Sequence, residues 1–304
     1  EIRRDFHEKL IIDGTTCGFY LFDDAGNGSA LLHPSDELTG IKYRLLPMTR
    51  SMIGGLFTAE EAEHHNALIS EHLLAADGAR LMDRPPQYKG GKNNMFQRAE
   101  TSPCFSREIG IFYTHAHLRY IEAMARMGKA DLMWQAIGKV NPVGVADSVP
   151  NALPRQANAY FSSSDAVVAT RYEADENYDK IKSGETKVEG GWRIYSSGPG
   201  IFLQVVMSGM VGMRRLYDMV EIDPVLPKSL DGLEVEMPWD GKTIHIKYSV
   251  KEGTSSPKSV TLNGTTIISC GITENPYRDG GWVVDGASFD ALLEKDGNQL
   301  EIQL

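Results

Sequence analysis

The stretch VEIDPVLP, residues 220–227, marks the point at which the character of the chain changes. Beyond it the chain runs in short segments separated by turn signals, and one of them, TIHIKY at residues 243–248, alternates between polar and apolar side chains. Alternation with period two places successive side chains on opposite faces of a half-exposed strand. The Asn263-Gly264 pair suits the two-residue turn of a hairpin. We therefore predict a small antiparallel β domain over residues 220–304.

The part before this stretch, residues 1–219, is predicted to be mainly helical. Its first clear helix opens with TAEE at residues 58–61, a capping box in which Glu61 reaches back to the Thr58 amide. Further helices are predicted over residues 117–127, 131–137 and 164–178. Residues 1–57 are predicted instead as extended segments joined by tight turns.

Residues 200–211 form a segment that is apolar on nearly every side. The segment contains Ile201, Phe202, Leu203, Val205 and Met210. A helix that is hydrophobic all round needs partners on all sides, so we predict that this helix is buried. The preceding stretch, residues 143–191, is polar and rich in Ser, Asn and Tyr, which favours surface elaboration.

The composition is that of a globular protein that does not bind nucleic acid. The 304 residues include 41 acidic and 31 basic ones, a formal charge of −10, with no Lys/Arg stripe to attract a nucleic-acid backbone or a membrane surface. No apolar run approaches the roughly 18 residues that span a bilayer. The three cysteines, Cys17, Cys104 and Cys270, are far apart, which favours a reducing, cytoplasmic setting over a disulfide scaffold or a zinc site. The first residues carry no initiator Met and no signal peptide, so we expect the polypeptide to continue upstream.

The stretch SSGPG, residues 196–200, precedes the apolar segment and is the first candidate site. Ser197 is a favourable N-cap, and Pro199 falls in the first turn, where proline is tolerated. The free amides and the positive dipole end at a helix start suit an anion such as phosphate. An ordinary capped helix without a ligand explains the same residues.

The stretch REIGIFYTHAH, residues 107–117, is the second candidate site. His115 and His117 are two residues apart and cannot share one face of a helix, so a helical zinc pair is not expected. A protonated histidine beside a helix start can donate a hydrogen bond to an oxyanion. A structural histidine that bonds to backbone groups is the alternative.

The stretch RQANAYFSSSD, residues 155–165, is the third candidate site. Its amides, hydroxyls and aromatic rings are the groups that grip sugar hydroxyls and stack on sugar rings. A polar loop before a helix explains the stretch nearly as well. No sequence context singles out a general acid among the carboxylates considered, Asp36, Glu37, Asp83 and Glu108.

Three segments in this order resemble the inverting sugar phosphorylases of glycoside hydrolase family 94. Residues 108–115 are similar to the family's Glu-Asn-Gly-Gly-Ile-Phe-x-His segment, and residues 195–202 to its Thr-Gly-Thr-Ala-x-Trp segment. Residues 220–227 resemble the family's Leu-x-Ile-Asp-Pro-x-Ile-Pro junction into its C-terminal β domain. Ser197 in place of Thr, and Pro199-Gly200 in place of Thr-Ala, depart from the pattern.

The resemblance implies an α+β multidomain protein. Residues 1–219 would be the C-terminal half of an (α/α)6 catalytic barrel, and residues 220–304 a C-terminal antiparallel β domain. Phosphate is expected to bind to His115, Ser197 and Gly198. Contacts with the sugar are expected from Glu108, Arg155, Gln156 and Tyr160. The family's general-acid Asp has no counterpart here, so the chain is assigned no catalytic residue and no metal site.

The activity that the resemblance implies is reversible phosphorolysis of a β-linked gluco-oligosaccharide to α-glucose 1-phosphate with inversion, a glycosyltransferase reaction of the phosphorylase type. The long polar stretch after residue 151 resembles the group that includes 1,2-β-oligoglucan phosphorylase, which points to a 1,2-β-glucan (sophoro-oligosaccharide) substrate. This chain would supply the phosphate-binding side, and the upstream part of the same enzyme would supply the general acid. No cofactor is expected, since inorganic phosphate is a substrate, and a homodimer is left open.

Two alternatives come from other classes of protein. A non-catalytic sugar-binding or assembly module would keep the aromatic and amide residues but would not need His115 to lie near the Ser197 helix start. A glycoside hydrolase on the same barrel would need two carboxylates and no phosphate site. The placement of His115 relative to Ser197 and Gly198 therefore discriminates between the three interpretations.

Overall fold

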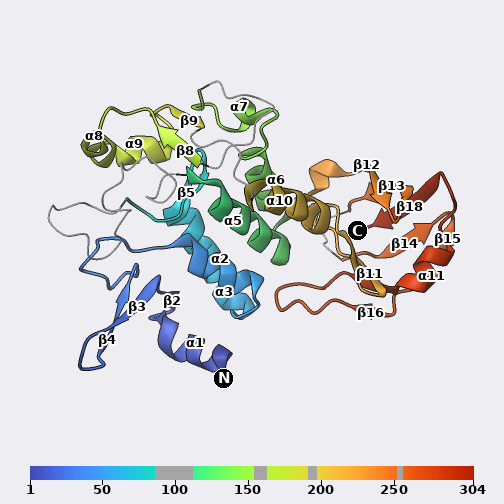
Figure 1. Cartoon of the computed structure of the whole chain (residues 1–304), viewed down its shortest axis with the longest axis horizontal. Coiled ribbons are helices and arrows are strands. Elements are labelled where there is room, and N and C mark those ends of the chain that lie inside the picture. Colours follow the sequence, from blue (N-terminus) through green and yellow to red (C-terminus); the bar gives the residue numbers. More distant parts are fainter. Residues whose placement is uncertain (86–111, 154–162, 191–196, 252–255) are drawn as a thin grey trace. The chain divides into compact units, whose positions relative to one another are not determined.

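A computed structural model describes residues 1–85, 112–153, 163–190, 197–251 and 256–304 (Figure 1). The chain divides into two compact units. The helical unit comprises Glu1–Ala123 with Gln135–Ile201, and the β unit comprises Met124–Trp134 with Phe202–Leu304. Within the described ranges, every helix is too short or too polar to cross a lipid bilayer.

The first residues of the helical unit form two hairpins flanked by two helices. One hairpin joins β1 (Ile11–Ile12) to β2 (Thr15–Thr16), and the other joins β3 (Phe19–Phe22) to β4 (Gly28–Leu31). Asp13 and Gly14 have φ values of 47° and 78°, as a tight two-residue hairpin turn requires. The predicted extended segments are confirmed here. The sequence prediction missed the two helices, α1 (Ile2–Leu10) and α2 (Leu45–Ile53).

The two missed helices lack the local signals that announce a helix. Neither has a side-chain cap, and α1 buries none of its residues. Helix α2 has Pro47 in its first turn, where a proline is tolerated, and it is held by the burial of Leu45, Met48 and Met52. Packing rather than capping therefore decides that α2 forms.

The next elements of the helical unit run from α3 to α6. They are α3 (Ala59–Leu68), a π-helical turn η1 (Ile69–Leu73), the hairpin of β5 (Leu74–Ala75) and β6 (Gly78–Ala79), α5 (Thr114–Arg126) and α6 (Ala130–Gly138). The predicted capping box is confirmed, because Thr58 Oγ1 accepts from the Glu61 amide at 3.2 Å and Glu61 Oε2 accepts from the Thr58 amide at 2.8 Å. The two helices predicted after it are confirmed as α5 and α6, with α5 starting three residues earlier than expected.

The polar stretch after α6 combines short helices with a small antiparallel sheet. Its elements are α7 (Val145–Ser148), β8 (Ser163–Ala166), α8 (Arg171–Glu176), α9 (Tyr178–Ser183) and β9 (Val188–Gly190). Strand β8 lies between β9 and β7 (Phe112–Tyr113). The prediction of one helix over residues 164–178 is therefore wrong at its start, because pairing with two distant strands outweighs the local preference.

The apolar segment before the β unit is helical, as α10 (Ser197–Gln204) and a π-helical turn η2 (Val205–Met210). Within this stretch Val205 is buried, whereas Leu203 is 60% exposed. The prediction that this helix is buried on all sides is wrong for this chain. The described residues cover the side that carries Val205 and leave the side that carries Leu203 open.

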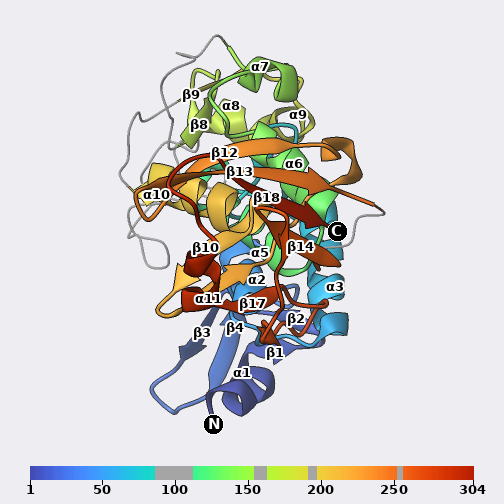
Figure 2. The same cartoon turned by 90° about the vertical axis from the view of Figure 1, so that its right-hand side faces the viewer.

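The β unit contains two sheets (Figure 2). The first is antiparallel and has the order β10 (Met213–Leu216), β11 (Met219–Ile222), β17 (Trp282–Asp285) and β16 (Gly271–Ile272). The second has the order β12 (Glu234–Trp239), β13 (Lys242–Ser249), β18 (Asn298–Gln303), β14 (Ser259–Leu262) and β15 (Thr265–Thr266). The predicted hairpin at Asn263-Gly264 is confirmed between β14 and β15. An α+β unit is thus confirmed, and its first strand begins at Met213.

One pairing in the second sheet departs from the prediction of an antiparallel domain. Strands β13 and β18 are parallel, with Ile246 opposite Leu300. Parallel neighbours need a long crossover rather than a tight turn, and here the residues between Ser249 and Asn298 provide it. No short-range sequence signal announces such a pair.

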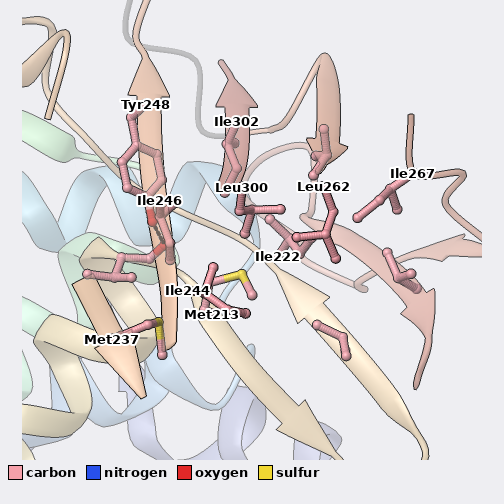
Figure 3. Packing of buried hydrophobic residues seen from close by; sticks show 14 of the residues in the cluster. Met213, Ile222, Met237, Ile244, Ile246, Tyr248, Leu262, Ile267, Leu300 and Ile302 are labelled. Atoms are coloured by element: carbon pink, nitrogen blue, oxygen red, sulfur yellow. Dashed lines mark hydrogen bonds between the residues drawn. The ribbon is translucent and has the colours of Figure 1, made fainter. Parts of the chain in front are cut away.

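The two sheets of the β unit share one apolar core (Figure 3). Ile244, Ile246 and Tyr248 point inward from β13 and are at most 1% exposed, whereas the residues between them are partly or fully exposed. The predicted alternation of β13 is therefore confirmed. Each fully buried aliphatic or aromatic side chain contributes about 1.5–3 kcal/mol, so this core accounts for much of the stability of the unit.

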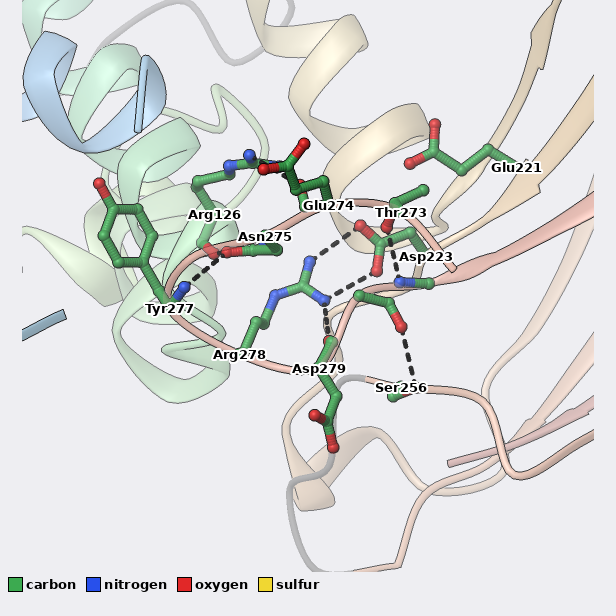
Figure 4. A network of polar contacts seen from close by, with 12 residues as sticks. Arg126, Glu221, Asp223, Ser256, Thr273, Glu274, Asn275, Tyr277, Arg278 and Asp279 are labelled. Carbon is green, nitrogen blue, oxygen red and sulfur yellow. Dashed lines mark hydrogen bonds and ion pairs between the residues drawn. The ribbon is translucent and has the colours of Figure 1, made fainter. Parts of the chain in front are cut away.

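The connection between β16 and β17 is held by polar contacts (Figure 4). Arg278 forms a two-pronged ion pair with Asp223, with N–O distances of 2.8 and 2.9 Å. Asn275 Nδ2 donates to the Arg126 carbonyl at 2.9 Å, and Arg126 Nη2 donates to the Glu274 carbonyl at 3.0 Å. The bond from Asn275 satisfies the Arg126 carbonyl in the last turn of α5, which an isolated helix leaves unpaired.

Candidate functional site

His115 lies in the first turn of α5 and is half-buried. Its ring is near that of Tyr113, with 5.7 Å between the ring centroids. Within the described part of the chain, the imidazole forms no hydrogen bond and no ion pair. A half-buried imidazole without a hydrogen-bond partner among the described residues is a candidate group for binding a ligand.

Two arginines set the electrostatic potential at His115. Arg119 is four residues along α5 and so lies on the same helix face, and Arg50 is an exposed residue of α2. Burial, then Arg119 and Arg50, lower the pKa of His115 below its usual value, while Glu122 acts in the opposite direction. The imidazole is therefore neutral near pH 7, and a nearby anion would oppose the effect of the arginines.

The two arginines differ in their own partners. Arg119 pairs with Glu122, which neutralises part of its charge. Arg50 forms no side-chain hydrogen bond or ion pair with any residue that the structure describes. Sequence reasoning missed both. The spacing of four residues within α5 could have pointed to Arg119, whereas nothing in the sequence connects Arg50 to a position 65 residues further on.

His117 is buried and serves the fold. Its Nδ1 accepts a hydrogen bond from the Ala79 amide at 2.9 Å, and its Nε2 donates to the Ala136 carbonyl at 2.8 Å. Burial lowers the pKa of His117 to about 4, so the ring is neutral. The structural interpretation therefore holds for His117, and the expectation that the two histidines do not act as a pair is consistent with their different surroundings.

The first candidate stretch, residues 196–200, contains the start of a helix. Helix α10 begins at Ser197, and Gly198 is buried. The predicted helix is therefore present, with Ser197 as its first residue and Pro199 in its first turn, and the capping role of Ser197 stays a prediction. The convergence of Ser197 and Gly198 with His115 stays a prediction. The predicted sugar-binding residues lie outside the described residues: Glu108, Arg155, Gln156 and Tyr160.

A polar cavity of about 260 Å³ lies elsewhere in the helical unit. It is lined by Asp83, Arg84, Asp175, Glu176, Tyr178, Asp179 and Lys182. Asp83 Oδ1 accepts from the amides of Lys42 and Tyr43, and Lys182 Nζ donates to the His72 carbonyl. These side chains bond to the backbone, and the cavity contains neither His115 nor Gly198, so we do not regard it as the candidate site.

Comparison with known proteins shows what the chain is similar to. Residues 212–303 match a family model described as the glycoside phosphorylase C-terminal domain. The chain is 42% identical over 265 residues to a 1,2-beta-oligoglucan phosphorylase from Listeria innocua, an alignment that covers 86% of this chain and 24% of that protein. The chain is related to the glycoside phosphorylases. The resemblance found in the sequence is therefore confirmed.

Two more distant relatives are consistent with this relationship. The chain is 23% identical to an N,N'-diacetylchitobiose phosphorylase from Vibrio proteolyticus, over 83% of this chain and 30% of that protein. It is 29% identical to a cyclic beta-(1,2)-glucan synthase from Rhizobium meliloti, over 52% of this chain and 5% of that protein. This phosphorylase-related chain thus spans less than a third of the length of these relatives.

Proposed function

We propose that the chain is the phosphate-binding part of an inverting phosphorylase that acts on 1,2-β-linked gluco-oligosaccharides. The relationship to the glycoside phosphorylases supports the reaction class, and the 42% identity to 1,2-beta-oligoglucan phosphorylase supports the substrate. The observation that carries the proposal is His115, half-buried beside two arginines and without a hydrogen-bond partner among the described residues.

The proposed reaction transfers a glucosyl group to phosphate. A phosphate oxygen forms a bond to the anomeric carbon from the face opposite the leaving group, the glycosidic C–O bond breaks, and a carboxylic acid protonates the leaving oxygen. The products are α-glucose 1-phosphate and the shortened oligosaccharide. We assign the carboxylic acid to residues outside this chain, and no cofactor enters the reaction.

In this reaction His115 binds phosphate and orients the attacking oxygen. A phosphate dianion beside the imidazole offsets Arg50 and Arg119, which favours the protonated ring and a charge-assisted hydrogen bond. Ser197 and Gly198, at the start of α10, are proposed to donate to the other phosphate oxygens. Positioning and charge complementarity lower the barrier without a covalent intermediate.

The proposal is tested by His115→Ala in the complete enzyme that contains this chain. Loss of a charge-assisted hydrogen bond costs about 1.5–3 kcal/mol, so the KM for phosphate should rise roughly tenfold to a hundredfold. The KM for a 1,2-β-linked gluco-oligosaccharide should change far less. Initial rates of glucose 1-phosphate formation, measured while each substrate is varied, give both constants.

His245→Ala is the matched control, because His245 is a partly exposed histidine of β13 in the other unit. It should leave both constants unchanged. A His115→Ala enzyme that loses affinity for the oligosaccharide while its phosphate KM is constant would contradict the assignment. Release of free glucose in place of glucose 1-phosphate would favour the hydrolase, and the absence of turnover in the unmodified enzyme would favour the binding module.

A further inference from the structure

The turn between β5 and β6 contacts the chain on both sides of His115. Gly78, at the start of β6, has a φ of 133°, a backbone conformation that L side chains rarely adopt. A Cβ atom added there would lie 2.5 Å from Phe112 Cε2 and 2.9 Å from His117 Nδ1. Phe112 and His117 are at most 1% exposed. Phe112, three residues before His115, and His117, two residues after it, therefore both pack against Gly78.

His117 holds the first turn of α5 to two other elements. Its Nδ1 accepts from the Ala79 amide of β6, and its Nε2 donates to the Ala136 carbonyl of α6. The two bonds use both ring nitrogens and permit one tautomer and one ring orientation. The first turn of α5 cannot rotate or slide without breaking one of these bonds.

We propose that His117, packed on Gly78, is a positioning residue for His115. This inference rests on the phosphate-binding role proposed for His115 above. His115 belongs to the first turn of α5, so the backbone of that turn determines where its side chain starts. His117 fixes that backbone two residues away, and Phe112 fixes the strand that leads into it. The imidazole of His115 is thereby held ready for phosphate before phosphate binds.

His65 provides a matched control for a purely structural role. It is fully buried, its Nδ1 donates to the Glu61 carbonyl at 2.7 Å, and its Nε2 accepts from the Thr16 amide of β2 at 3.1 Å. His65 and His117 thus each attach a helix to a short hairpin by accepting from a strand amide, while the other ring nitrogen donates to a carbonyl of the same helix in His65 and of α6 in His117. They differ in that His117 is two residues from the proposed phosphate ligand.

A double-mutant cycle in the complete enzyme tests the inference. Misplacement of a binding group by about 1 Å can cost a hundredfold, so we expect His117→Leu to raise the KM for inorganic phosphate about tenfold. It should leave the KM for the oligosaccharide nearly unchanged. In the His115→Ala background the same substitution should have no further effect on phosphate, because the group that it positions is gone. His117→Gln, which can donate and accept, should restore part of the affinity, and His65→Leu should leave the phosphate KM unchanged.

Other outcomes distinguish the failure of this inference from that of the proposed function. An equal effect of His117→Leu in both backgrounds, or a constant phosphate KM in His117→Leu, would show that His117 is structural only. A constant phosphate KM in His115→Ala would overturn the phosphate-binding role itself. Should His117→Leu fail to fold, the cycle is run with His117→Gln: a smaller rise in the phosphate KM that disappears in the His115→Ala background supports the inference, and an unchanged phosphate KM contradicts it.

Discussion

The interiors of the two units are stabilised by different kinds of contact. In the helical unit, polar side chains are buried and paired, among them Asp77 with Arg80 and the neutral histidines His65 and His117. In the β unit, the core consists of aliphatic and aromatic side chains from alternating strand positions. Alternation is a short-range pattern, whereas some polar contacts of the helical unit connect distant residues, such as His117 with Ala79, 38 positions apart, and Arg80 with the Ile181 carbonyl, 101 positions apart. The stability of the helical unit therefore depends on contacts that no local pattern reveals.

The Asp77–Arg80 pair is the most buried charged contact among the described residues of the helical unit. Arg80 Nη2 donates to Asp77 Oδ1 at 2.8 Å and to the Ile181 carbonyl at 3.4 Å. The guanidinium lies 5.6 Å from the centroid of the Tyr178 ring. The Arg80 side chain is 1% exposed and that of Asp77 is 2% exposed, so the two charges compensate each other in a buried environment.

We expect the largest difference in stability between the two units from Arg80→Met, which destabilises the helical unit. The substitution removes the Arg80 guanidinium from the buried Asp77 carboxylate, and breaking a buried ion pair costs about 3–5 kcal/mol. Hydrogen exchange, measured by mass spectrometry peptide by peptide, should show faster exchange in α5 and α9 and unchanged exchange in β13 and β18. The control Ile246→Val should cost about 1 kcal/mol, with faster exchange in β13 and β18 and unchanged exchange in α5 and α9. Equally faster hydrogen exchange in both units after Arg80→Met would contradict the claim that the two units are stabilised by different contacts.

Acidification should also affect the helical unit more than the β unit. Burial lowers the pKa values of His65 and His117 to about 4, against an ordinary value of 6.5. Below pH 6.5 the unfolded chain binds protons that the folded chain does not, so stability falls as the pH falls from 6.5 toward 4. At pH 5 the loss is about 2 kcal/mol for each histidine.

The same exchange experiment, at pH 7.5 and pH 5 after correction for intrinsic exchange rates, measures this effect. The β unit has no buried histidine among its described residues and should change little. His65→Gln and His117→Gln should each flatten the pH dependence of the helical unit. Stability of the helical unit that is constant from pH 7.5 to 5 would show that the two histidines are not held neutral by burial.

The smallest expected effect concerns a polar bond in the apolar core of the β unit. The hydroxyl of Tyr248 donates to the Val211 carbonyl at 2.6 Å, and burial raises the pKa of Tyr248, so the hydroxyl stays protonated. Tyr248→Phe removes the bond while keeping the ring, and should cost about 1 kcal/mol in the β unit alone. Urea unfolding followed by hydrogen exchange in β13 gives the value. A loss above about 3 kcal/mol would mean that this bond matters as much as core packing.

Elements with short-range causes were predictable from the sequence. The hairpin at Asn263-Gly264, the alternation in β13 and the capping box at Thr58 each depend on residues within a few positions of one another. The resemblance to the sugar phosphorylases was also visible in three short segments. Helices α1 and α2 were not predictable, because neither has a side-chain cap. The strand β8 was missed because its partners are far away in the sequence.

The sequence by itself determined that His115 belongs to a phosphorylase-like segment and that it cannot share a helix face with His117. Only the tertiary structure decided that His117 is buried between Ala79 and Ala136, that burial, then Arg119 and Arg50, lower the pKa of His115, and that β13 and β18 run parallel. Turns, caps and alternation act over a few residues, so a sequence displays them directly. The burial of a side chain and the charge around it depend on residues that are far apart in the sequence and that only folding brings together.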